Sequence, residues 1–430
     1  MKTVASCALG CKVNQYESEA IAELFAKEGF KPVGVNEKAD VYIINTCTVT
    51  NFGDKKSRQL IRRVKKLNPD SIVAVIGCYP QTSPEDVLGI DGVNIILGTK
   101  DRASVVQRVL EYDPSMGVRN YVSSISSEKD FEELKTKELK GRTRAYLKIQ
   151  DGCDNFCSYC IIPYARGPVR SREPQNILSE VKRLSENGFK EIVLTGIHVA
   201  SYGRDIGGIG LSDIIKQVAR FDGIERIRLS SVEPNAITED FISTARSVEK
   251  LCPHFHLSLQ SGSGRILKAM NRRYTPEEYY KAVCLLRDAV KDVSFTTDII
   301  AGFPGETEKD FEETLQFAEK IGFLKIHAFP YSPKPGTVAA ALSGRLPNSV
   351  KSERTSRLIN LGERSGLEFI KSFEGRTLPV LYEEKNREGF YEGHTDNYIT
   401  VKTKSDTEIS KEIIGTRLEK AFKDYAEGAL

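Results

Sequence analysis

Residues 145–160 read AYLKIQDGCDNFCSYC, an apolar strand pattern that leads directly into three closely spaced cysteines. Cys153, Cys157 and Cys160 follow a C-x3-C-x2-C spacing. Three thiolates on one short loop can bind three irons of a four-iron cube and leave the fourth iron without a protein ligand. An open metal position is where substrate chemistry takes place. We therefore expect a catalytic [4Fe–4S] cluster here, with the amino and carboxylate groups of S-adenosylmethionine (SAM) on the open iron.

A structural zinc site is the main alternative for this central triad. Structural zinc takes four protein ligands, and no histidine lies within 30 residues of the motif on either side. The motif also lies at the carboxyl end of a predicted strand, where barrel enzymes place their active sites. Both observations favour the iron–sulfur interpretation.

The strand before the motif is the first of six. Each of the first five is followed by a helical pattern, and the six begin near Ala145, Ile192, Arg226, His254, Ser294 and Lys325. Parallel strands with outer helices predict an α/β fold, here a partial (β/α)6 barrel over residues 143–371. Its last part, residues 350–372, is expected to be a connecting helix.

The two ends of the chain predict separate units. Residues 1–112 indicate a three-layer α/β domain with a parallel sheet, with strands at 3–9, 41–45 and 72–76 and helices at about 14–29 and 54–67. Residues 113–142 have little apolar content and are expected to be a linker. Residues 372–430 alternate β-rich runs with turns, at 378–382, 398–402 and around 408–414, which predicts a small antiparallel β-barrel.

Composition narrows the class of protein. The chain has 430 residues, of which 40% are hydrophobic and 28% charged, as in ordinary globular proteins. No apolar run reaches the length of a transmembrane helix, and the start MKTVASCALG lacks the pattern of a signal peptide. A cytoplasmic protein without a membrane partner is expected. In that compartment nine cysteines indicate metal binding or catalysis rather than disulfides.

Three further cysteines share a structural position although they are far apart in sequence. Cys11, Cys47 and Cys78 each follow the end of a predicted parallel strand. Such ends meet at one edge of a sheet, where helix N-termini stabilise thiolates. A second three-cysteine cluster is one interpretation, and three reduced, buried cysteines are the other. The remaining cysteines are expected to be structural: Cys7, Cys252 and Cys284.

A basic amphipathic helix is predicted close to the N-terminal triad. Residues 55–66 contain seven lysines and arginines in twelve positions. At 100° per residue, the basic face comprises Lys55, Arg58, Arg62, Lys65 and Lys66, and the apolar face Leu60, Ile61, Val64 and Leu67. The basic face can bind RNA phosphates, the alternative being a solvated surface. Three more arginines are expected to add positive charge at the barrel mouth: Arg166, Arg170 and Arg172.

Charge elsewhere gives little support for RNA binding. The net charge is only +3, and residues 372–430 contain nine lysines and arginines against twelve acidic residues. The C-terminal barrel is therefore expected to contact RNA either through a local basic face, such as Lys402 and Lys404, or through its shape rather than its charge.

Both triads, together with several further motifs, resemble the radical-SAM methylthiotransferases over nearly the whole chain. The motifs are GCKVNQ at 10–15, NTCTVT at 45–50, GCY at 77–79, the central cysteine run, SLQSG at 258–262, DIIAGFPGE at 298–306 and FPYS at 329–332. This resemblance implies an N-terminal cluster domain at 1–112, a radical-SAM domain at 143–371 and a TRAM domain at 372–430. The first two motifs are similar to the branch that acts on N6-threonylcarbamoyladenosine.

The resemblance implies a tRNA methylthiotransferase that inserts a methylthio group at C2 of this nucleoside, beside the anticodon. It implies two SAM molecules and two [4Fe–4S] clusters, held by the two cysteine triads. Expected partners are the tRNA, a low-potential electron donor such as flavodoxin or ferredoxin, and a sulfur donor. Alternatives are methylthiolation of isopentenyladenosine or of a ribosomal-protein aspartate, and a non-catalytic Fe–S protein that binds RNA.

The resemblance also places SAM-binding residues at the ends of the barrel strands. These residues are Tyr159, Thr195, Gly196, Ser231, Glu233, Gly302 and Gly305. Tyr159 is expected at the adenine, Thr195 and Gly196 at the methionine amino group, and Ser231 and Glu233 at the ribose. The two later glycines either let the backbone approach the adenine or form a structural turn.

Overall fold

The computed structural model describes residues 1–134 and 143–430. The predicted linker therefore falls partly outside the described residues, at 135–142. Within the described ranges, no helix is both long enough and apolar enough to cross a membrane.

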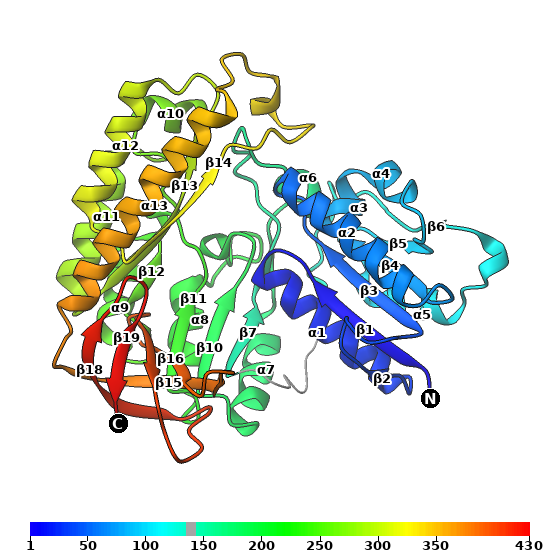
Figure 1. Cartoon of the computed structure of the whole chain (residues 1–430), viewed down its shortest axis with the longest axis horizontal. Coiled ribbons are helices and arrows are strands. Elements are labelled where there is room, and N and C mark those ends of the chain that lie inside the picture. Colours follow the sequence, from blue (N-terminus) through cyan, green and yellow to red (C-terminus); the bar gives the residue numbers. More distant parts are fainter. Residues whose placement is uncertain (135–142) are drawn as a thin grey trace.

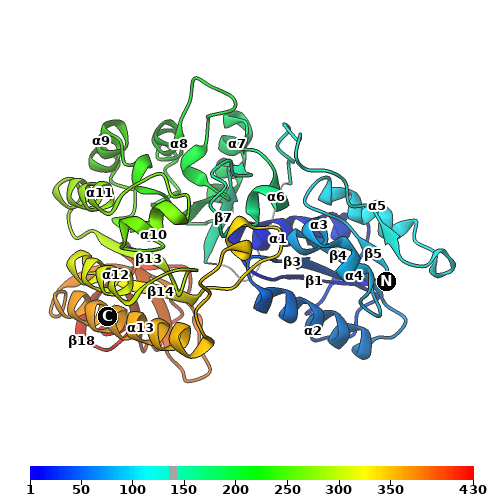
Figure 2. The ribbon, with the colours of Figure 1, turned by 90° about the horizontal axis from the view of Figure 1, so that it is seen from above.

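The N-terminal unit is a six-stranded parallel sheet in the order β2-β1-β3-β4-β5-β6. Its strands are β1 (Thr3–Ala8), β2 (Lys31–Pro32), β3 (Val41–Thr46), β4 (Ile72–Gly77), β5 (Ile95–Ile96) and β6 (Arg119–Asn120). Helices α1 (Lys12–Lys27) and α5 (Val105–Leu110) pack on one face and α2 (Asn51–Leu67) on the other, while α3 (Cys78–Thr82) and α4 (Pro84–Leu88) are short (Figure 2). The predicted three-layer α/β fold is confirmed.

Alternate residues of the central strands explain the two covered faces. Val41 and Ile43 of β3 pack with α1, whereas Tyr42 and Ile44 pack with α2. A parallel strand buried on both sides needs apolar residues at every position. The sheet also extends further than expected, because β6 lies in the stretch predicted as a linker and pairs with β5.

The central unit contains the six predicted parallel strands as two three-stranded sheets. They are β7 (Arg144–Lys148), β10 (Glu191–Thr195), β11 (Arg226–Leu229), β12 (His254–His256), β13 (Ser294–Ala301) and β14 (Lys325–Pro330). Parallel bridges, such as Val232 to Leu257, join the two sheets into one open barrel. Short pieces at the cluster loop are β8 (Gln150–Asp151), β9 (Arg170–Ser171) and α6 (Ile162–Arg166).

Helices cover the outside of these strands (Figure 1). They are α7 (Pro174–Glu186), α8 (Leu211–Val218), α9 (Glu239–Ser247), α10 (Gly264–Ala269), α11 (Pro276–Ala289), α12 (Glu308–Ile321) and α13 (Asn348–Lys371). Capping boxes at Thr275 and Thr307 fix the starts of α11 and α12. Helix α13 lies along β14, so residues predicted as a connecting helix form the last outer helix of the barrel.

The C-terminal unit is a closed barrel in the order β15-β16-β17-β19-β18. Its strands are β15 (Thr377–Lys385), β16 (Tyr391–Thr395), β17 (Thr400–Thr403), β18 (Ile413–Ala421) and β19 (Ala426–Ala429). The antiparallel prediction is correct except for β17 and β19, which pair in parallel. The predicted strand around 408–414 starts only at Ile413, and β16 and β19 were not predicted.

The C-terminal barrel packs against the starts of the central strands. Arg226, the first residue of β11, donates hydrogen bonds to the carbonyls of His394 (3.0 Å) and Pro379 (2.7 Å). Ser294, the first residue of β13, donates to the carbonyl of Asn397 (2.6 Å). The C-terminal unit therefore covers the end of the central barrel opposite to the strand ends that precede the cysteine motif.

Candidate active site

A cavity of about 800 Å³ is lined by residues of all three units, and both cysteine triads are among them. Cys11 immediately precedes α1, Cys47 follows β3 and Cys78 is the first residue of α3. Burial raises the pKa of Cys47, and the nearby Cys78 and Cys11 raise it further. The cysteines of the central loop line the same cavity: Cys153, Cys157 and Cys160. The structure thus gathers the two predicted triads at a single site.

Glycine permits the close approach of these loops. Gly10 has φ of +95°, and a Cβ atom there would lie 2.7 Å from the Cys47 sulfur. Gly152, directly before Cys153, has φ of +74° and lies against the carbonyl of Pro168. A side chain at either position would push a cysteine-bearing loop away from the cavity.

In each triad, one cysteine sulfur accepts a hydrogen bond from an arginine. Arg166 Nε lies 3.2 Å from Cys78 Sγ, and Arg272 Nη1 lies 3.3 Å from Cys157 Sγ. N–H donors of this kind stabilise negative charge on sulfur and are typical outer contacts of cluster thiolates. Both arginines are buried, so bulk water does not weaken these contacts.

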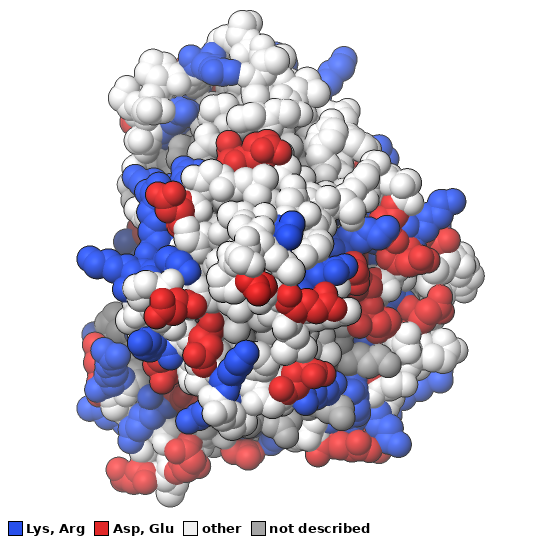
Figure 3. All heavy atoms as spheres, turned by 90° about the vertical axis from the view of Figure 1, so that its right-hand side faces the viewer, with Lys and Arg blue, Asp and Glu red and all other residues white. Residues whose placement is uncertain are grey.

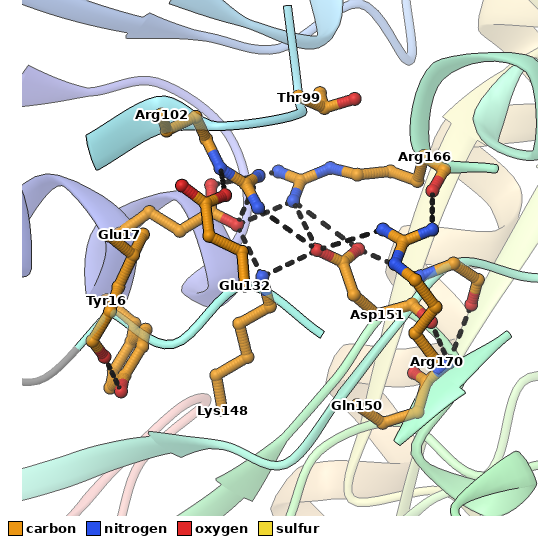
Figure 4. A network of polar contacts seen from close by, with 12 residues as sticks. Tyr16, Glu17, Thr99, Arg102, Glu132, Lys148, Gln150, Asp151, Arg166 and Arg170 are labelled. Atoms are coloured by element: carbon orange, nitrogen blue, oxygen red, sulfur yellow. Dashed lines mark hydrogen bonds and ion pairs between the residues drawn. The ribbon is translucent and has the colours of Figure 1, made fainter. Parts of the chain in front are cut away.

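A buried ion network connects the two triads (Figure 4). Glu17 of α1 forms ion pairs with Arg102 (2.7 Å), Lys148 (2.8 Å) and Arg166 (2.6 Å). Asp151, two residues before Cys153, pairs with the same three cations. Burial alone would raise the pKa of Glu17, but the three cations hold it well below its ordinary value. The network fixes α1, which follows Cys11, against the segments on either side of the central triad.

This network corrects the expected role of three arginines. Arg166 and Arg170 pair with Asp151, and Arg172 pairs with Glu133 (2.7 Å) and Glu180 (2.6 Å). All three are buried. They compensate internal carboxylates and do not present positive charge at the mouth of the barrel.

Five of the seven predicted SAM residues line the cavity: Tyr159, Thr195, Gly196, Ser231 and Glu233. Buried Glu233 accepts hydrogen bonds from Asn155 (3.1 Å), contacts His198 (3.4 Å) and pairs with Arg272 (3.0 Å). Burial raises its pKa, but the bonds from His198 and Arg272 lower it more, so the group stays ionised at neutral pH. The charged form is a good acceptor for ribose hydroxyls.

Gly302 and Gly305 do not line this cavity. The Gly302 amide donates to Glu306 (2.8 Å), whose carboxylate pairs with Arg354 (2.6 Å). Both glycines have positive φ, +76° and +78°. The segment forms a turn, and the expected approach of these two glycines to the adenine stays a prediction.

The donor set of the cavity fits two iron–sulfur clusters. Burial raises the pKa of Cys47 and Cys160 to about 12 and that of Cys153 to about 11, so iron must displace their protons. Within the described part of the chain, no three metal-ligating side chains are close enough to hold a single ion. A four-iron cube, in contrast, distributes three thiolates over three different irons.

The basic face of α2 is only partly free. Leu60, Ile61 and Val64 are buried as predicted, but Leu67 is 41% exposed. Arg58 donates to the Tyr79 hydroxyl (2.8 Å), and Lys65 donates to the Ser71 carbonyl (2.7 Å). The exposed cations of this helix are Lys55, Lys56, Arg62, Arg63 and Lys66.

Several cavity residues were missed from the sequence. Asn155, His198 and Arg272 surround Glu233, and Lys12 and Tyr398 line another part of the wall. Lys12 and Asn155 carried a local signal because they adjoin or lie between predicted cysteine ligands, and His198 because it lies two residues after Gly196, a predicted SAM residue. The others come from loops whose spacing contains no motif.

Comparisons with known proteins agree with this arrangement. The model of the Radical SAM superfamily matches residues 147–318, and that of Uncharacterized protein family UPF0004 matches residues 3–98. Threonylcarbamoyladenosine tRNA methylthiotransferase MtaB of Bacillus subtilis is 42% identical, covering 100% of this chain and 96% of the relative. A tRNA-2-methylthio-N(6)-dimethylallyladenosine synthase of Acetivibrio thermocellus is 36% identical, covering 98% of this chain and 89% of the relative.

A solved structure supports the fold. The radical SAM methyltransferase TsrM from Kitasatospora setae, with cobalamin and a [4Fe–4S] cluster bound, matches with a TM-score of 0.59 at 15% identity. The match covers 79% of this chain and 77% of that one. The match to the Radical SAM model, together with the relatives named above, defines a radical SAM enzyme. Given the full-length relatives, the chain belongs to the tRNA methylthiotransferase family of that superfamily, whose cofactors are SAM and [4Fe–4S] clusters.

Proposed function

We propose that this enzyme inserts a methylthio group at C2 of N6-threonylcarbamoyladenosine beside the tRNA anticodon, using two SAM molecules and two [4Fe–4S] clusters. The observation that carries this proposal is the convergence of six cysteines, in two triads, on one cavity. The named activity of the Bacillus subtilis relative, 42% identical over the full chain, supports the choice of nucleoside.

Each triad has a distinct part in the proposal. Cys153, Cys157 and Cys160 would hold the cluster at which SAM is cleaved, and Cys11, Cys47 and Cys78 the cluster associated with the inserted sulfur. Bound SAM at the first cluster supplies the radical chemistry that an aromatic C–H bond requires, because no side-chain base can deprotonate such a carbon.

The protein's own groups bind and orient the reactants. Tyr159 lies among the ligands of the central triad and offers its ring to the adenine of SAM. Glu233 accepts the ribose hydroxyls, while Asn155 and Arg272 fix the orientation of its carboxylate. Residues of all three units line the cavity in which the reacting atoms would meet.

The proposed tRNA contact is the exposed side of α2. This helix starts four residues after Cys47, and Asn51 at its start donates to the Pro333 carbonyl (3.0 Å) after β14. Lys55 and Lys56, close to the start of this helix, are therefore its cations nearest to the N-terminal triad, where they can bind phosphates. Figure 3, which faces the N-terminal unit, shows basic and acidic side chains interspersed, so binding would rest on local groups rather than on a broad basic surface.

Mass spectrometry of modified tRNA nucleosides tests the proposal. Anaerobically reconstituted enzyme, SAM, a low-potential reductant of the flavodoxin or ferredoxin type and a sulfur source are incubated with tRNA that contains N6-threonylcarbamoyladenosine. The expected result is its 2-methylthio derivative. Modification only of isopentenyladenosine, offered in a parallel reaction, would overturn the proposed substrate and leave the enzyme class intact.

A further inference from the structure

The wall of the cavity next to the C-terminal barrel is positively charged. We call this wall the cavity floor, and it comprises Lys12, Arg228, His254 and Tyr398, all of which line the cavity. Each unit contributes to it: Lys12 from α1, Arg228 and His254 from the central barrel, and Tyr398 from the turn between β16 and β17. Neither the predicted SAM residues nor the cysteine ligands belong to it.

The floor has more cations than nearby carboxylates. Arg228 pairs with Glu191 (2.7 Å), but Arg226 shares the same carboxylate (3.7 Å). Lys12 has no carboxylate within ion-pair distance among the described residues, and its ammonium lies 5.9 Å from the centre of the Tyr146 ring. At least one cation of the floor is thus available to an anionic ligand.

The neighbouring titratable groups respond to this charge. Burial would raise the pKa of Tyr398, but Arg144, Lys12 and Arg228 together lower it below its ordinary value. Burial and then the charges of Arg228 and Lys12 lower the pKa of His254. In a recessed site the effective dielectric constant is lower than in water, so these positive charges attract an anion more strongly there than they would in water.

Tyr398 is held rigidly at the floor. Its ring stacks on His254 (4.3 Å between centroids) and on His394 (4.9 Å), and the Arg228 guanidinium lies 4.8 Å from its centroid. Its backbone has φ of +72°, an unusual value for a non-glycine residue. A side chain fixed in this way loses little entropy when a ligand binds.

We propose that the cavity floor binds the carboxylate of the threonylcarbamoyl group, with Lys12 as its charge partner and Tyr398 as a hydrogen-bond donor. This inference rests on the proposed function and adds specificity to it. The dimethylallyl group of the alternative nucleoside has no charge and cannot use this site. The acidic C-terminal barrel would then contribute to selection of the nucleoside through Tyr398 rather than to binding of RNA phosphates.

The ratio of the enzyme's affinities for the acid and the ester form of the nucleoside, measured with the reconstituted enzyme, tests this inference. Three anticodon stem-loops are compared: one with N6-threonylcarbamoyladenosine, one with its carboxyl methyl ester and one with unmodified adenosine. Wild type should bind the acid about 10- to 100-fold more tightly than the ester, the range expected for a hydrogen bond to a charged group. Lys12→Gln should bind acid and ester equally, and Tyr398→Phe should reduce the preference.

Controls separate the floor from its neighbours. Lys66→Gln on α2 should weaken all three stem-loops alike. Because Lys12 adjoins Cys11, iron content and SAM cleavage are measured in every variant; Tyr398→Phe, which is far from any cysteine in sequence, provides the second test. SAM also carries a carboxylate, so loss of SAM binding with an unchanged acid-to-ester ratio would assign the floor to SAM and overturn the inference.

The two proposals fail in different ways. If wild type does not methylthiolate the threonylcarbamoyl stem-loop, the proposed function is wrong. If it does so with equal affinity for acid and ester, or if Lys12→Gln keeps the wild-type ratio, the function stands and the role of the floor is wrong.

Discussion

Replacing Glu17 by glutamine should loosen α1 selectively. Glu17 is fully buried, and its carboxylate pairs with Arg102, Lys148 and Arg166 at 2.6–2.8 Å. Removing one partner of a buried ion pair costs about 3–5 kcal/mol, because the remaining charges stay buried without compensation. Asp151 still pairs with these cations, so we expect the lower end, about 3 kcal/mol.

Hydrogen exchange followed by mass spectrometry measures this change locally. A cost of about 3 kcal/mol corresponds to roughly a hundredfold loss of protection, provided that α1 opens as a unit. Peptides covering residues 12–27 should show it. Glu186→Gln is the matched control, because its pair with Lys182 is 3.8 Å long and exposed, and such pairs contribute at most about 1 kcal/mol.

The pH dependence follows from the direction of the pKa shift. The folded-state pKa of Glu17 is depressed, so its stabilisation is complete above the unfolded value of about 4.3 and is lost only as pH falls toward the lower folded value. The difference between wild type and Glu17→Gln should therefore be constant from pH 7 to pH 5. Protection of α1 that matches wild type within twofold would refute the role assigned to the network.

Three further predictions concern the clusters and the RNA. Arg272→Lys removes a guanidinium donor from Cys157 and should shift the midpoint potential of the central cluster to a more negative value in spectroelectrochemical titration; an unchanged potential contradicts the contact. Since burial raises the pKa of Cys47 and Cys160 to about 12, iron binding must release protons, and the yield of cluster reconstitution should rise from pH 6.5 to 8.5; a yield that falls over this range argues against neutral thiols. Lys55, Arg62 and Lys66 are replaced together by glutamine, and tRNA affinity is measured by fluorescence titration at several salt concentrations. The slope of log affinity against log salt should become shallower by the equivalent of up to about three phosphate contacts, whereas an unchanged slope places the RNA elsewhere.

The sequence was sufficient for most of the fold because its strong signals are local. Six strand–helix units predicted the barrel, and apolar strands that end in cysteine predicted the N-terminal sheet edge. Elements with short or weakly apolar strands were harder to predict: β6 has two exposed residues, and β19 is Ala-Glu-Gly-Ala. Their positions depend on strands already formed beside them, which is information that a local pattern does not contain.

The site was predictable where chemistry requires a fixed residue type. Cysteines at strand ends identified both triads. Charged residues were harder, because the sequence does not show their partners: Arg166 was expected at the barrel mouth and instead lies buried between Glu17 and Cys78. Gly302 and Gly305 show that positive-φ glycines do not by themselves identify a ligand site, because such glycines also form structural turns. Tyr398 is brought to the cavity only by docking of the C-terminal barrel.

Iron content and SAM cleavage under anaerobic conditions test the central claim, two three-cysteine clusters in one cavity. Wild type should contain about eight irons per chain, and Cys157→Ala and Cys47→Ala about four each. Cys157→Ala should form no 5′-deoxyadenosine, whereas Cys47→Ala should still form it without methylthiolating tRNA. Four irons in the wild type, or SAM cleavage that survives Cys157→Ala, would contradict the account.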